Sequence, residues 1–156
     1  MHSLLEILPR LGESDRFAAA RRLIAVRAPD LPDDEAGELA RSVVSLLTAP
    51  ECAGVFHPDS LAEVPVSGVV DDRVVNGKID RVAVSDGEVR LFDYKSGSRV
   101  PETVDETPEA YVYQMAAYKA LMRGIYPDKT VRCFLLWTEA PKVVEITDLV
   151  SRYERI

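Results

Sequence analysis

Residues 77–97 read GKIDRVAVSDGEVRLFDYKSG, and this stretch decides the fold. Apolar side chains alternate with polar ones over about 74–84 and again over about 89–96, which is the pattern of half-buried strands. The dipeptide Asp86-Gly87 between the two runs is a strong signal for a two-residue hairpin loop. The sequence therefore predicts an antiparallel hairpin in the middle of the chain.

The register of this hairpin brings two acids together. If Ser85 pairs with Glu88 across the turn, Asp80 lies directly opposite Asp93. Like charges directly opposite one another destabilise a sheet, and at roughly 5 Å and an effective dielectric of about 20 they repel by about 3 kcal/mol. A divalent cation between them would reverse the sign of this interaction. Either the pair binds a metal, or water separates the acids on a solvated sheet face.

Lys95 favours the metal-binding interpretation. It lies two residues after Asp93, so the two side chains share one face of the strand. A lysine beside metal-bound carboxylates can hold an attacking water or stabilise negative charge that develops on a phosphate. The D-x-K pattern therefore points towards hydrolysis of a phosphate ester.

The rest of the chain predicts helices on both sides of the hairpin and two further strands. The order of these elements predicts an α/β fold with a mixed sheet, in one domain that has a helical segment at 1–50 and an α/β core at 51–156. The expected helices begin almost at residue 1 and end before Pro9, run over about 15–27, follow a cap at Asp33 to about residue 47, and run over about 109–123 with Thr107 as N-cap and Pro108 as first helical residue. The expected strands are about 63–70, 74–84, 89–96, 131–137 and 143–146.

The helix expected over 109–123 carries a second group of polar side chains. Gln114 and Tyr118 are four residues apart and share one helix face, with Tyr111 one turn earlier. Core packing is the simpler interpretation of the two tyrosines. Gln114 differs from them, because its amide can both donate to and accept from a backbone group or a phosphate.

Composition limits the classes of function. The chain has 156 residues and a net charge of −7, from 26 acidic and 19 basic residues. This balance argues against a generic basic binder of nucleic acid or anionic membrane, but a metal-dependent enzyme needs carboxylates. No apolar run approaches the roughly 20 residues of a membrane span. Cys52 and Cys133 fit no metal-binding spacing, and we expect reduced core thiols rather than a disulfide.

Four motifs in this order resemble the RecB family of the PD-(D/E)XK nuclease superfamily, in particular the nuclease domains of AddA-type helicase–nucleases. The motifs are a helix with His2, G-x-x-D at 77–80, D-Y-K at 93–95, and Q-x-x-x-Y at 114–118. The resemblance covers essentially the whole chain. It implies a restriction-endonuclease-like mixed sheet flanked by helices, with an N-terminal helical segment.

The resemblance also implies roles for individual residues. Metal ligands would be His2, Asp80, Asp93 and the backbone carbonyl of Tyr94, with Lys95 as the catalytic lysine. Gln114 and Tyr118 would position DNA or support the site. Glu63 would be a secondary acid of the site, although its position alone fits an exposed strand end equally well. His57 lies outside the family pattern.

The implied activity is Mg²⁺-dependent DNA hydrolysis of the exonuclease type, with Mn²⁺ as a possible substitute, in double-strand break repair. The implied partners are DNA, a helicase part of the same polypeptide and an AddB-like partner protein, in the bacterial cytoplasm at the nucleoid and without a membrane. Because the chain starts one residue before His2, we expect a piece of a longer helicase–nuclease. Alone, such a piece can lack activity, since the helix that presents His2 is cut short.

Two other functions stay open. A catalytically silent domain of the same fold would serve as a scaffold or hold DNA ends, and loss of the D…D-x-K set would be its mark, which is not seen here. Stand-alone RecB-like nucleases typically carry a set of cysteines for an iron–sulfur cluster. Two lone cysteines do not fit that class.

Overall fold

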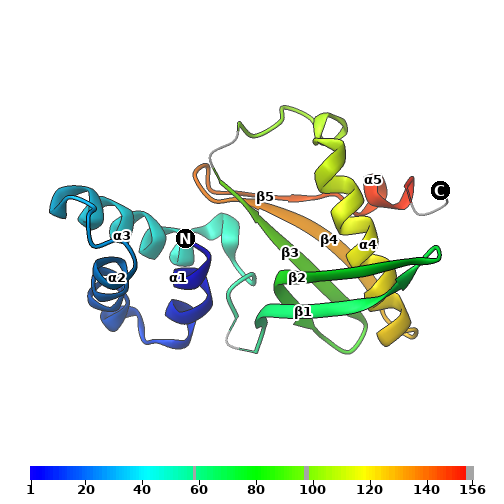
Figure 1. The fold of residues 1–156 in the computed structure, drawn as a ribbon, viewed down its shortest axis with the longest axis horizontal. Coiled ribbons are helices and arrows are strands. Elements are labelled where there is room, and N and C mark those ends of the chain that lie inside the picture. Colours follow the sequence, from blue (N-terminus) through cyan, green and yellow to red (C-terminus); the bar gives the residue numbers. More distant parts are fainter. Residues whose placement is uncertain (58, 97–98, 154–156) are drawn as a thin grey trace. The chain divides into compact units, whose positions relative to one another are not determined.

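The structure is a computed structural model that describes residues 1–57, 59–96 and 99–153. The chain forms two compact units, residues 1–58 and 59–156, which we call the helical unit and the sheet unit. Figure 1 shows the elements of each. The boundary falls near the expected change of character at residue 50, and a single domain over the whole chain stays a prediction.

The helical unit contains three α-helices and two short 3₁₀ turns. Leucine and alanine side chains form its interior, with Leu5, Leu8, Ala20 and Val43 fully buried. All three helices agree with the predicted ones to within about two residues at each end. The helices are α1 (His2–Ile7), α2 (Glu13–Arg27) and α3 (Asp33–Thr48), and the turns span Leu8–Arg10 and Pro50–Cys52.

Two predicted helix caps are wrong. Asp33 is the first helical residue of α3, not its cap, and its carboxylate accepts a hydrogen bond from Arg21 Nη2 at 3.1 Å. Likewise Pro108, not Thr107, precedes the first residue of the fourth helix, and the Thr107 hydroxyl donates to the carbonyl of Val104 at 2.7 Å. In both cases a nearby partner takes the side chain that would otherwise accept from the first helical turn.

The sheet unit is built on one five-stranded mixed sheet, as predicted. Its strands follow one another in chain order, and each neighbouring pair is antiparallel except β3 and β4, which are parallel. A parallel pair needs a crossover connection, and a helix supplies it here. The strands are β1 (Leu61–Val70), β2 (Arg73–Val84), β3 (Glu88–Lys95), β4 (Thr130–Trp137) and β5 (Lys142–Glu145).

Helix α4 (Glu109–Ile125) is this crossover, and Figure 1 shows it lying across one face of the sheet. Its buried residues Met115 and Met122 belong to one apolar core with Leu91 of β3 and Leu135 of β4. A short helix after β5, α5 (Thr147–Ser151), is not predicted from the sequence, because five residues are too few to show a helical period.

Both cysteines are free and buried, which confirms the prediction of reduced core thiols. Burial raises the pKa of the Cys52 thiol to about 11, so this side chain stays a neutral, unreactive thiol at physiological pH. Among the described residues no helix is long and apolar enough to cross a membrane.

The hairpin register is as predicted up to one position. Ser85 N–H donates to the carbonyl of Glu88 at 2.9 Å, and the ladder runs from Val84 opposite Val89 to Arg81 opposite Phe92. It ends one pair short of Asp80 and Asp93, so the expected ladder pair of these two acids does not form.

A break in the alternation of β2 accounts for this early end. Ile79 and Val82 both belong to the core beneath α4, although they are three positions apart. Strict alternation would put them on opposite faces, so the strand turns once between them, at Asp80. The two acids therefore meet through their side chains, beyond the last pair of the ladder.

Candidate functional site

Two buried carboxylates form the centre of the site. Asp80 on β2 is 6% exposed and Asp93 on β3 is 5% exposed. Burial raises the pKa of Asp80 to about 7, and the Asp93 carboxylate adds to this through charge repulsion and a hydrogen bond. The Tyr94 N–H, which donates to Asp80 Oδ2 at 2.7 Å, acts in the opposite direction. The pair therefore disfavours two simultaneous negative charges unless a cation is near.

Glu63 brings a third carboxylate to this centre. One of its carboxylate oxygens lies within 4.8 Å of an oxygen of Asp80. Its backbone has φ 51°, a left-handed conformation that is unfavourable for glutamate, and the β1–β2 ladder omits this residue between the pairs at Ala62 and Val64. Strained backbone of this kind is concentrated at functional sites. The conformation fits the interpretation of Glu63 as an acid of the site.

Lys95 is held between the acids and α4. Its Nζ forms an ion pair with Asp93 at 2.5 Å and donates to Gln114 Oε1 at 3.5 Å. The same ammonium lies 3.8 Å from the ring centroid of Tyr111, a cation–π contact. The backbone N–H of Thr138 donates to the Lys95 carbonyl at 2.9 Å, which fixes the end of β3.

The contacts of Gln114 continue along α4 and back to β2. Its Nε2 donates to the Tyr118 hydroxyl at 3.4 Å, and that hydroxyl donates to the Lys78 carbonyl at 3.4 Å. This leaves the amide oxygen facing Lys95. A Cβ atom on Gly77 would lie 2.6 Å from the Tyr118 hydroxyl, so only glycine lets this ring lie against β2.

The structure thus brings six of the predicted residues together: Glu63, Asp80, Asp93, Lys95, Gln114 and Tyr118. His2 is the first residue of α1, in the helical unit, and its role as a ligand stays a prediction. The Tyr94 side chain points to the other face of the sheet, where its hydroxyl accepts from Arg81 Nε at 3.0 Å. A role for its carbonyl also stays a prediction.

Tyr111 is a site residue that sequence reasoning assigns to the core. Its spacing with Gln114 and Tyr118 is visible in the sequence, but an aromatic at helical spacing is more often a packing residue. Its ring is partly buried, and Trp137 lies against it with 6.1 Å between ring centroids. The D-x-K lysine was the available signal, because a cation needs a partner on the neighbouring helix.

The donor set fits a divalent cation. Hard cations such as Mg²⁺ prefer carboxylate oxygens, and three carboxylates gather here. Asp93 Oδ2 is buried and has no hydrogen-bond partner of good geometry among the described residues, although Lys95 Nζ is close. An oxygen in that state has a lone pair available for a metal.

Comparison with protein families agrees with this chemistry. Residues 1–151 match the model of the PD-(D/E)XK nuclease superfamily, which covers nearly the whole chain. The chain belongs to the PD-(D/E)XK nuclease superfamily. Metal-dependent hydrolysis of phosphodiester bonds is the activity that membership implies.

Individual relatives add a little more. This nuclease is similar to one of the subunits of the ATP-dependent helicase/nuclease of Oenococcus oeni (strain ATCC BAA-331 / PSU-1), at 38% identity over 61 residues. The match covers 39% of the chain and 5% of that relative, so the chain spans only a small part of its length. A solved structure titled "Crystal structure of SSO0001" aligns with a TM-score of 0.40 and 15% identity, over 99% of the chain and 72% of that structure.

The close approach of Tyr118 to Gly77 gives a first prediction. In Gly77→Ala the added Cβ must displace the ring, and we expect a loss of about 1–3 kcal/mol in the free energy of unfolding, measured by urea denaturation. Gly124→Ala is the control, because a Cβ at that position in α4 meets no atom within 4 Å. Equal stability of the two variants would contradict the contact.

The raised pKa of Asp80 predicts how stability depends on pH without metal. The folded state holds this proton up to about pH 7, whereas the unfolded state releases it near pH 4, so the folded state binds more protons in between. The free energy of unfolding should therefore fall as the pH rises from about 4 to about 7, and level off above.

Urea midpoints measured in EDTA across this range test the expectation. Asp80→Asn should remove most of the fall, whereas Asp128→Asn, which changes an exposed acid on the loop before β4, should keep it. An unchanged pH profile in Asp80→Asn would show that other groups cause the fall.

The backbone at Glu63 gives a third prediction. Glu63→Gly and Glu63→Gln remove the same charge, but only glycine adopts φ 51° without strain. We expect the glycine variant to be more stable than the glutamine variant by about 1 kcal/mol in thermal or urea unfolding. The reverse order would mean that the left-handed backbone at this position is not strained.

Proposed function

We propose that this chain is the nuclease part of a helicase–nuclease and hydrolyses DNA phosphodiester bonds with Mg²⁺. One observation supports this above the others: the buried pair of Asp80 and Asp93, with Lys95 in contact, lies on a chain of a nuclease superfamily. The geometry provides a place for a cation, a place for a phosphate beside it, and a fixed ammonium.

The metal site in this proposal consists of Asp80, Asp93 and the carbonyl of Tyr94, with His2 as a further ligand and Glu63 as a nearby acid. When bound there, Mg²⁺ or Mn²⁺ supplies an activated water and neutralises charge on the scissile phosphate. The carboxylates of the chain hold that charge in a buried site, where electrostatic interactions are stronger than in water.

Lys95 acts on the reacting groups directly. Its ammonium donates hydrogen bonds to the attacking water or to a phosphate oxygen that gains charge in the transition state. Gln114 and Tyr111 act through Lys95: the amide oxygen and the aromatic ring keep the ammonium at one place beside Asp93. Tyr118 in turn orients the Gln114 amide.

The biological setting belongs to the same proposal. The name of the Oenococcus oeni relative supports a helicase part of the same polypeptide. By the resemblance we propose an AddB-like protein as partner, action on double-strand breaks in the bacterial cytoplasm at the nucleoid, and digestion from DNA ends in the manner of an exonuclease.

Two substitutions test the chemistry. With Mg²⁺ and a labelled DNA strand, Asp93→Ala should lose cleavage below detection, because its buried oxygens hold the cation. Lys95→Ala should slow cleavage by about 10²–10³, the size of losing one transition-state donor. Asp128→Ala, an exposed acid of the same sheet unit, should cleave at the rate of the unchanged chain.

The assay uses both the chain alone and the full-length helicase–nuclease, in which unwinding driven by ATP serves as the check on folding. Titration calorimetry with Mn²⁺ measures cation binding separately from cleavage. Cleavage retained by Asp93→Ala in the full-length protein would contradict the proposed function.

A further inference from the structure

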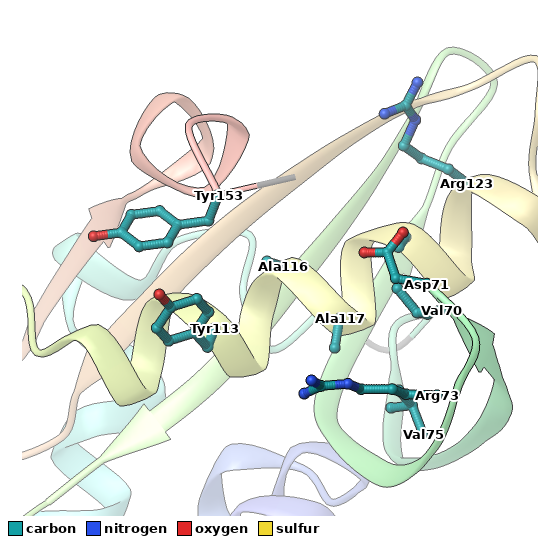
Figure 2. A pocket seen from close by; sticks show the side chains of 10 residues that line it. Val70, Asp71, Arg73, Val75, Tyr113, Ala116, Ala117, Arg123 and Tyr153 are labelled. Atoms are coloured by element: carbon teal, nitrogen blue, oxygen red, sulfur yellow. The ribbon is translucent and has the colours of Figure 1, made fainter. Parts of the chain in front are cut away.

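A groove lies over the outer side of α4, on the flank of the helix that does not face the acidic site. Its volume is about 510 Å³, which is within the range of ligand sites. Three small residues of α4, Ala116, Ala117 and Ala120, line it along the helix. Figure 2 shows Arg73 of β2 on one side of the helix and Tyr153, which follows α5, on the other.

Aromatic side chains mark one end of this groove. Tyr113 is 49% exposed, a large exposed fraction for an aromatic side chain. Its ring makes an edge contact with Tyr153, with 4.9 Å between centroids and 82° between planes. This contact holds both rings in place while a large part of Tyr113 stays in contact with solvent. Nucleic-acid bases stack on aromatic rings of this kind without regard to sequence.

The charged residues of the groove are mainly cationic. Arg73 and Arg123 line it together with one acid, Asp71. In a chain with a net charge of −7 this local excess of positive charge is unusual, and it matches an anionic ligand. Arginine side chains bind phosphates, and the flat guanidinium also stacks on bases.

We propose that this groove binds a single strand of DNA, with bases on Tyr113 and Tyr153 and phosphates at Arg73 and Arg123. The proposal rests on the proposed function, because it makes the bound strand the substrate of the acidic site. Helix α4 connects the two places: Tyr113 in the groove directly precedes Gln114, which contacts Lys95. A strand in the groove is thereby held beside the residues that position the lysine.

Binding of a fluorescent oligothymidylate, measured by anisotropy in EDTA, tests the groove without cleavage. Tyr113→Leu should weaken binding about tenfold, whereas Tyr113→Phe, which keeps the ring, should stay within about twofold of the unchanged chain. Arg73→Gln should weaken binding and lower the slope of log affinity against log salt by about 0.7, the value for one phosphate contact on single strands.

Arg90→Gln is the matched control for charge. Arg90 lies on β3 and alternates with Leu91 and Asp93, so it is on the face of the sheet away from α4. This variant should bind the oligothymidylate like the unchanged chain. Equal affinity of Tyr113→Leu and Tyr113→Phe, or no binding by the unchanged chain, would overturn the proposal, and the second result would favour a protein partner in the groove.

Asp93→Ala separates this proposal from the proposed function. It should bind the oligothymidylate in EDTA like the unchanged chain, because the groove contains none of the acidic site. Loss of cleavage together with unchanged binding supports both proposals. Retained cleavage would remove the proposed function alone, and the anisotropy of the tyrosine variants would still decide whether the groove binds a single strand.

Discussion

The burial of two carboxylates side by side is the constraint on which the sheet unit depends. Asp80 and Asp93 lose most of their hydration, and each makes the other's charge more costly. A fold has two ways to accept such a pair, a bound proton or a nearby cation. The surroundings prepare for both, through the raised pKa of Asp80 and the ammonium of Lys95. A structural sheet would gain nothing from this arrangement, and apolar residues of similar size would be more stable there.

Helix α4 connects the second half of the site to this pair. Tyr111, Gln114 and Tyr118 all lie on the flank of the helix that faces the site, at spacings of three and four residues. The position of Lys95 therefore depends on how α4 lies on the sheet. That position depends in turn on close approaches such as Tyr118 against Gly77. The glycine of the G-x-x-D motif thus has a packing reason, separate from any contact with substrate.

Much of this site could be predicted from the sequence, because its signals are local. Strand alternation and the Asp86-Gly87 turn fixed the hairpin, and helical spacing placed Gln114 beside Tyr118. Other features depend on contacts between distant parts of the chain. The left-handed backbone of Glu63 and the turn of β2 at Asp80 follow from how three strands meet, and neither residue type signals them.

The misplaced caps have a similar origin. Thr107 and Asp33 are good cap residues by type, but Val104 and Arg21 take their side chains. The part played by Tyr111 was hidden for the opposite reason, since its type and spacing already had a sufficient explanation in core packing. His2 depends on the placement of the helical unit, which sequence spacing does not address.

The sequence distance between partners has a consequence for the order of folding. The hydrogen bond from Tyr94 to Asp80 spans 14 positions within one hairpin, whereas Lys95 meets Gln114 across 19 and Thr138 across 43. Local contacts close at a lower cost in chain entropy, so the two acids should meet before the supports of the lysine are in place. The nascent hairpin then carries its repulsion without help, and substitutions that relieve it should speed folding more than they slow unfolding.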